Sequence, residues 1–222
     1  MSSEAGVPKA RAPKRARGKQ RVAELRQAAA EVFAEKGYEA ATMTEIAARA
    51  RAPIGSLYQF FPVKDALADW LVQNYIALLV ADLQALEARA SRIDTETLVD
   101  NLLGLLRAHE RERAAAAPLV EARMDERTRR TTFRHMLRKQ IAAILHVRSP
   151  TLSAEAAREM AVVLVSLMKA VSALVDEVSF PGRAAALRDL RSIAVQYIEE
   201  RLTLGSTDAY SQPPPKARNM AT

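Results

Sequence analysis

The sequence predicts an all-α protein, and three observations support this prediction. Ala, Leu, Glu and Arg, which are strong helix formers, dominate the composition. No stretch shows the sustained alternation of Val, Ile and Thr that is typical of strands. Nearly half of the 222 residues are apolar, which is sufficient for a sizeable core. The length leaves room for one small and one larger domain, or for a single elongated helical body.

The composition also excludes several classes of site. The chain has no cysteine, which excludes disulfides, thiolate zinc sites and cysteine nucleophiles. The basic N-terminal stretch lacks the apolar run of a secretory signal, and the longest apolar runs of the chain are short and interrupted by charges. We therefore expect a cytoplasmic protein that does not span a membrane.

The net charge of +7 is concentrated at the start of the chain. Residues 1–21 carry seven basic side chains and one acidic side chain, a sum of +6, so the other residues together carry only +1. A basic arm on a nearly neutral body predicts a polyanionic partner, although a solubilising tail has the same composition. Residues 1–19 mix Pro, Ala, Gly and basic residues without apolar periodicity, which predicts a disordered arm.

Apolar residues recur at helical spacing from Lys19 onward, which predicts the first helix. Gly37 is expected to end this helix as a left-handed C-cap. Thr42 and Glu45 have the spacing of a capping box, in which the threonine hydroxyl and the glutamate carboxylate each bind the other residue's backbone amide. The capping box predicts the start of a short helix of about eight residues.

A second short helix is predicted over residues 53–60, because Pro53 suits the first helical position and disfavours the α region at Ala52. A long helix over about residues 63–90 follows. Three helices, of which the last two are short and joined by a tight turn, have the geometry of a helix-turn-helix. We expect residues 20–65 to form this small domain.

Apolar stripes at helical spacing predict four further helices, at about residues 95–113, 116–147, 153–178 and 183–204. Residues 66–205 are expected to form the larger domain. Residues 206–222 are mostly polar and contain three consecutive prolines, which predicts a disordered tail.

Residues 29–67 contain a longer pattern whose spacing is intact. The pattern comprises Phe33, Gly37-Tyr38, Thr42, Ile46-Ala47, Ala50, Gly55-Ser56-Leu57-Tyr58, Phe61-Pro62 and Lys64. It resembles the DNA-binding signature of the TetR family of bacterial regulators. The resemblance implies an N-terminal three-helix helix-turn-helix domain, joined by a long helix to a larger C-terminal helical domain that binds an effector and dimerises.

The resemblance also implies a DNA-binding face on the two short helices. Contacts to the DNA backbone are expected from Thr42, Thr44, Tyr58 and Lys64, and contacts to base edges from Ile54, Gly55, Ser56 and Gln59. Gln59 is the candidate for a hydrogen-bonded base contact, with adenine as the expected base, and a solvated polar side chain is the alternative. Lys64 lies at a helix N-terminus, where a bound phosphate would offset the unfavourable macrodipole; an exposed lysine is the alternative.

Residues 22–70 hold five basic and seven acidic side chains, a sum of −2. A slightly acidic DNA-binding unit has poor non-specific affinity for DNA, because that affinity comes from cations on phosphates. We expect the basic arm to supply it through Arg15, Arg17 and Lys19, along phosphates or in the minor groove.

Three residues depart from the family pattern. Arg51 replaces the usual glycine of the turn, so a residue other than glycine is expected to adopt a positive φ there. Pro53 replaces a frequent polar cap, and Val63 replaces the frequent Ser or Asn that caps the long helix. These departures concern local geometry and leave the predicted class unchanged.

A homodimer is expected, because one recognition helix buries too little surface for tight specific binding. The resemblance implies that the last two long helices pair with those of a second copy as a four-helix bundle. The candidate interface residues are Met160, Leu164, Leu167, Val171, Leu174, Leu190, Ile193 and Tyr197. Packing within the monomer is the alternative for part of each stripe. Two-fold symmetry predicts a palindromic operator.

The resemblance further implies a small-molecule effector pocket in the larger domain. The candidate lining residues are Trp70, Tyr75, Leu102, Leu106, His109, Met124, Phe133, Met136 and Met168. Ordinary core packing is the alternative for each position. No metal and no cofactor are expected.

These observations predict a ligand-responsive, sequence-specific transcriptional regulator, with repressor as the commoner role in the family. The chain has three histidines and no HExxH motif, phosphate loop or nucleophile elbow, so an enzyme is not expected. The alternative is a helical adaptor that uses its basic arm for non-specific binding to nucleic acid or to a membrane surface.

Overall fold

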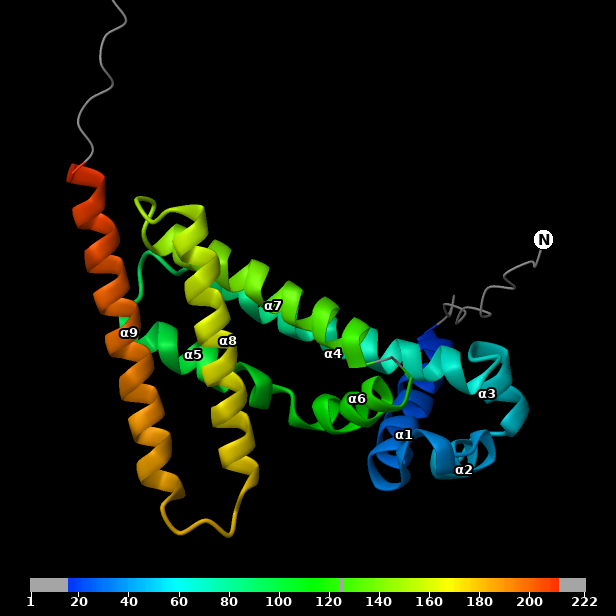
Figure 1. The fold of residues 1–222 in the computed structure, drawn as a ribbon. Coiled ribbons are helices and arrows are strands. Elements are labelled where there is room, and N and C mark those ends of the chain that lie inside the picture. Colours follow the sequence, from blue (N-terminus) through cyan, green and yellow to red (C-terminus); the bar gives the residue numbers. More distant parts are fainter. Residues whose placement is uncertain (1–15, 124–125, 212–222) are drawn as a thin grey trace, which may run out of the picture. The chain divides into compact units, whose positions relative to one another are not determined.

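The computed structural model describes residues 16–123 and 126–211, and in this part of the chain all regular secondary structure is helical (Figure 1). The helices are α1 (Ala16–Ala40), α2 (Met43–Arg49), α3 (Ile54–Phe60), α4 (Lys64–Glu87), α5 (Thr95–Ala108), α6 (Glu110–Arg123), α7 (Glu126–Arg148), α8 (Ala154–Asp176) and α9 (Arg183–Ser211). The predicted all-α fold class is confirmed.

The chain divides into two compact units, and helices α4, α5 and α7 each contribute residues to both. The first unit consists of Met1–Asp82 and Leu105–His135. The second consists of Leu83–Gly104 and Met136–Thr222. The first unit therefore contains α1, α2, α3 and α6 together with most of α4, and the second contains α8 and α9.

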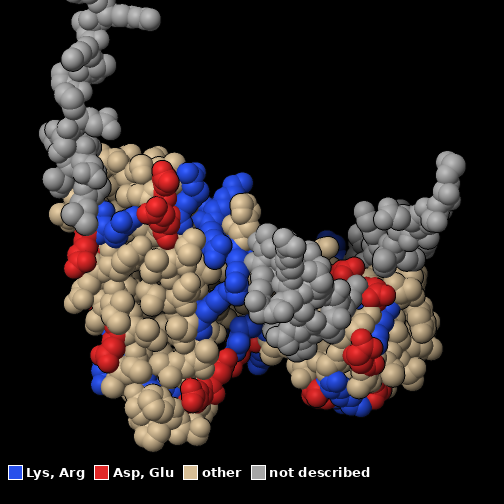
Figure 2. All heavy atoms as spheres, viewed as in Figure 1, with Lys and Arg blue, Asp and Glu red and all other residues tan. Residues whose placement is uncertain are grey.

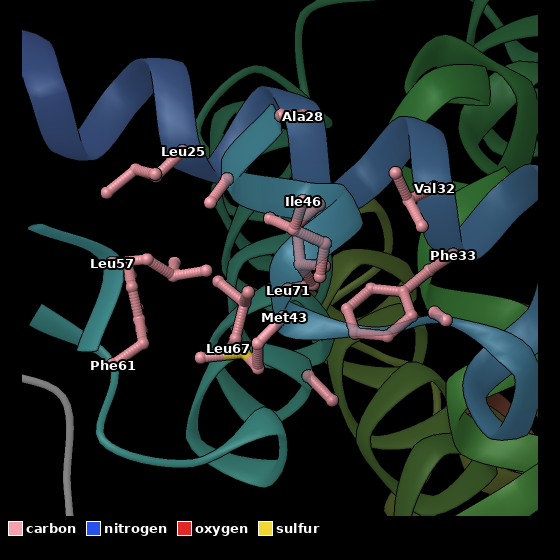
Figure 3. Packing of buried hydrophobic residues seen from close by; sticks show 14 of the residues in the cluster. Leu25, Ala28, Val32, Phe33, Met43, Ile46, Leu57, Phe61, Leu67 and Leu71 are labelled. Atoms are coloured by element: carbon pink, nitrogen blue, oxygen red, sulfur yellow. The ribbon is translucent and has the colours of Figure 1, made fainter. Parts of the chain in front are cut away.

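The core of the first unit is built from apolar side chains of α1, α2, α3 and the start of α4 (Figure 3). Its largest fully buried members are Phe33, Phe61, Leu25, Ile46, Leu57 and Leu67. Leu119 of α6 also belongs to this cluster, and α6 packs against α1. Burial of a Leu, Ile or Phe side chain contributes about 1.5–3 kcal/mol each, so this cluster fixes how α2 and α3 lie on α1.

Helix α1 differs from the prediction at both ends. It begins at Ala16, three residues before the expected start. Gly37 has φ 74° and ψ 177°, so the positive φ is confirmed, but the ψ is extended rather than left-handed helical. Gly37 interrupts the helix, as predicted, but helical structure resumes beyond this kink and α1 extends as far as Ala40.

We expect Gly37→Ala to lower the free energy of unfolding by about 1–3 kcal/mol, because this φ and ψ combination is essentially restricted to glycine. No atom lies within 4 Å of the position that the new Cβ would occupy, so the cost comes from the backbone alone. Urea titration followed by circular dichroism measures the loss. The matched control is Gly104→Ala in α5. A Cβ at Gly104 meets no atom within 4 Å, and the φ of Gly104 is not positive. This control should stabilise the protein by about 0.5–1 kcal/mol, and equal effects of the two substitutions would contradict the prediction.

The predicted signals around α2 and α3 are present. The Thr42 hydroxyl accepts a hydrogen bond from the Glu45 amide, and the Glu45 carboxylate accepts one from the Thr42 amide, which confirms the capping box. Arg51 has φ 48°, which confirms the positive φ expected in the turn between the two helices. Pro53 lies one position earlier than predicted, as the N-cap of α3 rather than its first residue.

The segment between residues 95 and 148 forms three helices where the sequence predicted two. The predicted helix over residues 95–113 ends at Ala108, and the predicted helix over 116–147 is replaced by α6 and α7. The earlier break allows α6 to pack against α1, where Leu119 is completely buried. Tertiary packing therefore sets boundaries that apolar periodicity does not show.

In the second unit, α8 and α9 pack against each other as an antiparallel hairpin (Figure 1). The buried side of α8 includes Met160, Leu164, Val165 and Met168. The α9 helix continues past Gly205 to Ser211, although the sequence predicted a disordered tail from residue 206.

Helix α4 is long and apolar enough to cross a membrane by length and composition alone. Leu67 and Leu71 are buried in the first unit, however, and Leu83 and Leu86 are buried in the second. This burial within the protein is what a core helix shows.

Candidate nucleic-acid interface

The outer side of α2 and α3 presents most of the residues expected to contact DNA. Thr42, Thr44, Gly55 and Gln59 are exposed, and Ser56 is half-buried. Ile54 and Tyr58 are large side chains that nevertheless remain 40% and 50% exposed. Apart from Lys64, these predicted residues therefore lie on the accessible surface of α2 and α3.

The opposite side of α3 is anchored in the core of the unit. Leu57 and Phe61 are 0% and 1% exposed, and both belong to the cluster that includes Ile46. Residues three and four positions apart share one side of a helix, so burying Leu57 and Phe61 directs Ile54, Tyr58 and Gln59 away from that core. The rotation of α3 is thus fixed by packing.

Gly55 has no structural role within the described chain. Its φ is not positive, and a Cβ at this position would meet no atom within 4 Å. A glycine inside a helix destabilises it by roughly 0.5–1 kcal/mol relative to alanine. A glycine that the fold does not require leaves the first turn of α3 open to close approach by another molecule.

Thr42 is already engaged within the protein. Its hydroxyl accepts from the Glu45 amide at 3.2 Å and lies 3.1 Å from the Glu45 carboxylate, to which it donates. Lys36 also binds this carboxylate, and the hydrogen bonds from Lys36 and Thr42 lower the pKa of Glu45. A contact from the Thr42 hydroxyl to DNA would therefore involve a group that already hydrogen-bonds to Glu45.

Lys64 has partners that the sequence did not predict. Its ammonium group donates hydrogen bonds to the carbonyl oxygens of Tyr38, Glu39 and Ala41, at 2.7, 3.3 and 3.0 Å. The same group lies 4.3 Å from the centre of the Tyr38 ring. Because an ammonium group has three donors, these carbonyls account for all of them. In this structure Lys64 joins the start of α4 to the end of α1.

Two further residues at this junction, Tyr38 and Asp65, were not among the residues predicted to contact DNA. The Tyr38 hydroxyl donates to the carboxylate of Asp65 at 2.5 Å, and the Tyr38 ring stacks on Phe33. The aromatic residue after Gly37 was part of the family pattern, but its partner lies 27 residues away. Only the folded chain brings the two together.

Ion pairs join α1 to α2. The two terminal nitrogens of Arg49 donate to the two carboxylate oxygens of Glu35, at 2.8 and 2.7 Å. One of them, Nη1, also lies 3.4 Å from the carboxylate of Glu31. Hydrogen bonding to Arg49 lowers the pKa of Glu35 and raises that of Arg49. Figure 2 shows acidic and basic side chains interspersed over this part of the viewed face. Its surface charge is therefore mixed rather than strongly basic.

The basic arm is described only at its end. Arg17 and Lys19 are exposed in the first turn of α1, whereas Arg15 lies outside the described residues. Val22 is the first buried residue of α1.

The candidate effector-pocket residues are divided between the two units. In the first unit, Tyr75 stacks on Phe133 with ring centres 6.3 Å apart, and burial raises the pKa of Tyr75 to about 12. His109 lies 2.8 Å from the Asp82 carboxylate. The first unit also contains Trp70 and Leu106. The second unit contains Leu102, Met136 and Met168. Met124 lies outside the described residues.

The candidate dimer residues fall into two groups within the second unit. Met160, Leu164 and Val171 are buried inside the unit, so in this structure they are core rather than surface. Leu167, Leu174, Leu190 and Tyr197 are half-buried, and Ile193 is exposed. The exposed valines Val162 and Val163 of α8 were not among the predicted residues.

Comparison with known proteins agrees with this architecture. Residues 25–70 match the family model of bacterial regulatory proteins of the tetR family. No curated protein sequence matches the chain.

Three solved structures share the fold. A TetR-family member from Streptomyces coelicolor A3 is 19% identical, with a TM-score of 0.56 over 82% of this chain and 98% of that chain. A gamma-butyrolactone receptor described as an ArpA-like protein is 22% identical, with a TM-score of 0.53 over 82% of this chain and 100% of that chain. The multidrug-binding protein EbrR, complexed with imidazole, is 19% identical, with a TM-score of 0.51 over 90% and 98%. Residues 25–70 therefore match the DNA-binding segment of the tetR family of bacterial regulatory proteins, which supports a DNA-binding transcriptional regulator, and the chain shares the all-α fold of TetR-family structures.

Proposed function

We propose that the protein is a ligand-responsive repressor that binds a palindromic operator as a homodimer and is released by a small molecule. The observation that carries the DNA-binding part is the outer side of α3, where Ile54, Tyr58 and Gln59 are exposed beside a glycine that the fold does not need. An exposed helix face with a small residue at its leading edge fits the major groove.

The proposed roles follow from position. Gln59 donates to and accepts from a base edge, with adenine as the expected partner, and Ile54 contacts a thymine methyl. Tyr58, Thr42 and Thr44 contact phosphates, and Ser56 faces a base edge close to Gly55. Since the Lys64 donors already have carbonyl acceptors, we propose that Lys64 orders the DNA-binding unit in place of the phosphate contact predicted from the sequence.

Dimerisation is proposed through the surface of α8 and α9. Val162, Val163 and Ile193 are exposed apolar residues on these two helices. Burying such side chains between two copies is favourable, and a two-fold dimer presents two α3 helices to a palindrome. Light scattering coupled to size-exclusion chromatography should report twice the mass of 24.4 kDa.

The effector is proposed to be a small organic molecule that the cytoplasm supplies. Two structures that share the fold are described as a gamma-butyrolactone receptor and a multidrug-binding protein, which supports a small-molecule effector without identifying it. We infer no catalytic role and no bound metal or cofactor.

The proposed function is tested by mapping the bound sites across the source genome, followed by gel shifts on the sites found. Specific binding to a palindrome that resists competitor DNA supports the repressor. Salt-sensitive binding without sequence preference would instead support a helical adaptor that uses its basic arm non-specifically. Reporter expression with the protein present and absent separates repression from activation.

Deleting residues 1–18 should reduce the salt dependence of DNA binding while leaving the core from Val22 onward intact. The deletion removes five basic side chains: Lys9, Arg11, Lys14, Arg15 and Arg17. Each lost phosphate contact should reduce the slope of log Kd against log salt by about 0.9. Fluorescence anisotropy with labelled operator DNA measures the slope. The matched control keeps the arm's length and replaces the five basic residues by Gln, and a slope unchanged in both variants would contradict the proposed role.

A further inference from the structure

An open groove of about 660 Å³ lies among α1, α4 and α6, entirely within the first unit. This volume is within the range of small-molecule sites, which is about 300–1,000 Å³. The groove contains one of the predicted effector residues, Trp70, together with Leu71, Arg26 and Arg111. It is therefore distinct from a pocket built on Met136 and Met168, which belong to the second unit.

Arg26 forms no ion pair with a carboxylate in the described part of the chain. Its guanidinium lies 3.7 Å from the centre of the Trp70 ring and 5.9 Å from that of Phe61. Its Nε atom is buried, and it has no hydrogen-bond partner in the described part of the chain. Burial lowers the pKa of Arg26, as expected for a cation without a neighbouring anion. By contrast, Arg21 of α1 binds the carboxylate of Glu24, and Arg49 of α2 binds that of Glu35.

Two arginines, Arg26 and Arg111, and two glutamates, Glu31 and Glu112, line the groove. Glu31 is engaged elsewhere, since its carboxylate accepts from Gln27 at 2.9 Å and lies 3.4 Å from Arg49. Glu112 stands beside Arg111 on α6. These four charges sum to zero, but neither Arg26 nor Arg111 has a carboxylate partner in the described part of the chain, so both guanidinium groups are available to an anionic ligand.

We propose that this groove binds a small planar carboxylate, such as an aromatic acid. The carboxylate accepts hydrogen bonds from Arg26 and Arg111, which stand on different helices. The planar body packs beside Trp70 and Leu71, and the Asn74 amide provides a further polar contact. Charge-assisted hydrogen bonds to arginine are stronger than neutral ones, so the acid is preferred over a neutral molecule of the same shape. A ligand held in this way bridges α1 and α6.

The proposal is tested by isothermal titration of the full-length protein with 2-naphthoate. Trp70 is the only tryptophan of the chain, so quenching of its fluorescence reports binding at the groove directly. We expect naphthoate to bind with a Kd below about 1 mM and to quench Trp70. The neutral analogue 2-naphthylmethanol should bind at least about tenfold more weakly.

Arg26→Gln and Arg111→Gln should each weaken naphthoate binding by about tenfold, since each removes a charge-assisted hydrogen bond. Arg111 is exposed, so its substitution keeps the test valid if the Arg26 variant does not fold. The matched control is Arg107→Gln, an exposed arginine of the same unit outside the groove, which should bind as the wild type does.

Three results would overturn the proposal: no binding at millimolar naphthoate, equal binding of the alcohol, or unchanged affinity in both groove variants. The last of these would place naphthoate elsewhere on the protein. The titration needs no DNA, so its failure leaves the proposed operator binding untouched.

Discussion

Gly55→Leu should abolish specific DNA binding while the protein remains folded. Gly55 is exposed and a Cβ at this position meets no atom within 4 Å, so the added side chain can extend into solvent in the free protein. In the proposed complex the leucine would stand between the first turn of α3 and the floor of the major groove. We expect the Kd for the operator to rise by about 100-fold or more, equivalent to about 2.7 kcal/mol. Fluorescence anisotropy with labelled operator DNA provides the measurement.

The stability of the same variants separates this effect from unfolding. Replacing glycine in a helix favours the folded state, so Gly55→Ala should raise the free energy of unfolding by about 0.5 kcal/mol. The alanine variant should bind the operator more tightly than the leucine variant, because alanine adds only one methyl group. Wild-type affinity in Gly55→Leu would show that α3 does not enter the groove at this residue.

The sequence was sufficient to predict the helix-turn-helix, because its signals are local. The capping box at Thr42 and Glu45 depends on residues three apart, and the positive φ at Arg51 follows from the length of the turn. The buried faces of α2 and α3 follow from apolar spacing, as at Ile46 and Leu57. Each signal acts within one or two helical turns, so no knowledge of the tertiary structure was needed.

Features that depend on contacts between distant segments could not be predicted in this way. Leu119 of α6 is buried in the core of the first unit, more than 40 residues away along the chain from any other buried member of that core. The stacking of Arg26 on Trp70 joins residues 44 apart, and neither residue has a motif that signals the other.

The candidate dimer surface illustrates a related limit. Apolar periodicity shows that one side of α8 is buried, but it does not show whether the partner belongs to the same chain. Met160 and Leu164 are covered by their own unit, whereas Val162 and Val163 are exposed. The predicted stripe therefore contains the internal core of the unit, and the exposed Val163 lies one turn from the half-buried Leu167, at the margin of that stripe.

Lys64→Met should lower the free energy of unfolding by about 2 kcal/mol. Among the substitutions in the DNA-binding unit, only Gly37→Ala is expected to have an effect of similar size. Methionine keeps most of the apolar stem but removes the donors to the carbonyls of Tyr38 and Ala41. Hydrogen bonds from a charged group contribute about 1.5–3 kcal/mol, and the half-buried carbonyls would lose their partner. Urea denaturation followed by circular dichroism measures the loss.

Lys36→Met is the matched control, because it removes a lysine of the same unit whose side chain is 46% exposed and paired only with Glu45 in the described residues. A surface ion pair of this kind contributes about 0–1 kcal/mol, so the control should change stability much less. The two variants also separate the alternatives for Lys64. If its role were a phosphate contact alone, Lys64→Met would weaken DNA binding at unchanged stability. A role in ordering the α1–α4 junction instead predicts that stability falls even when no DNA is present.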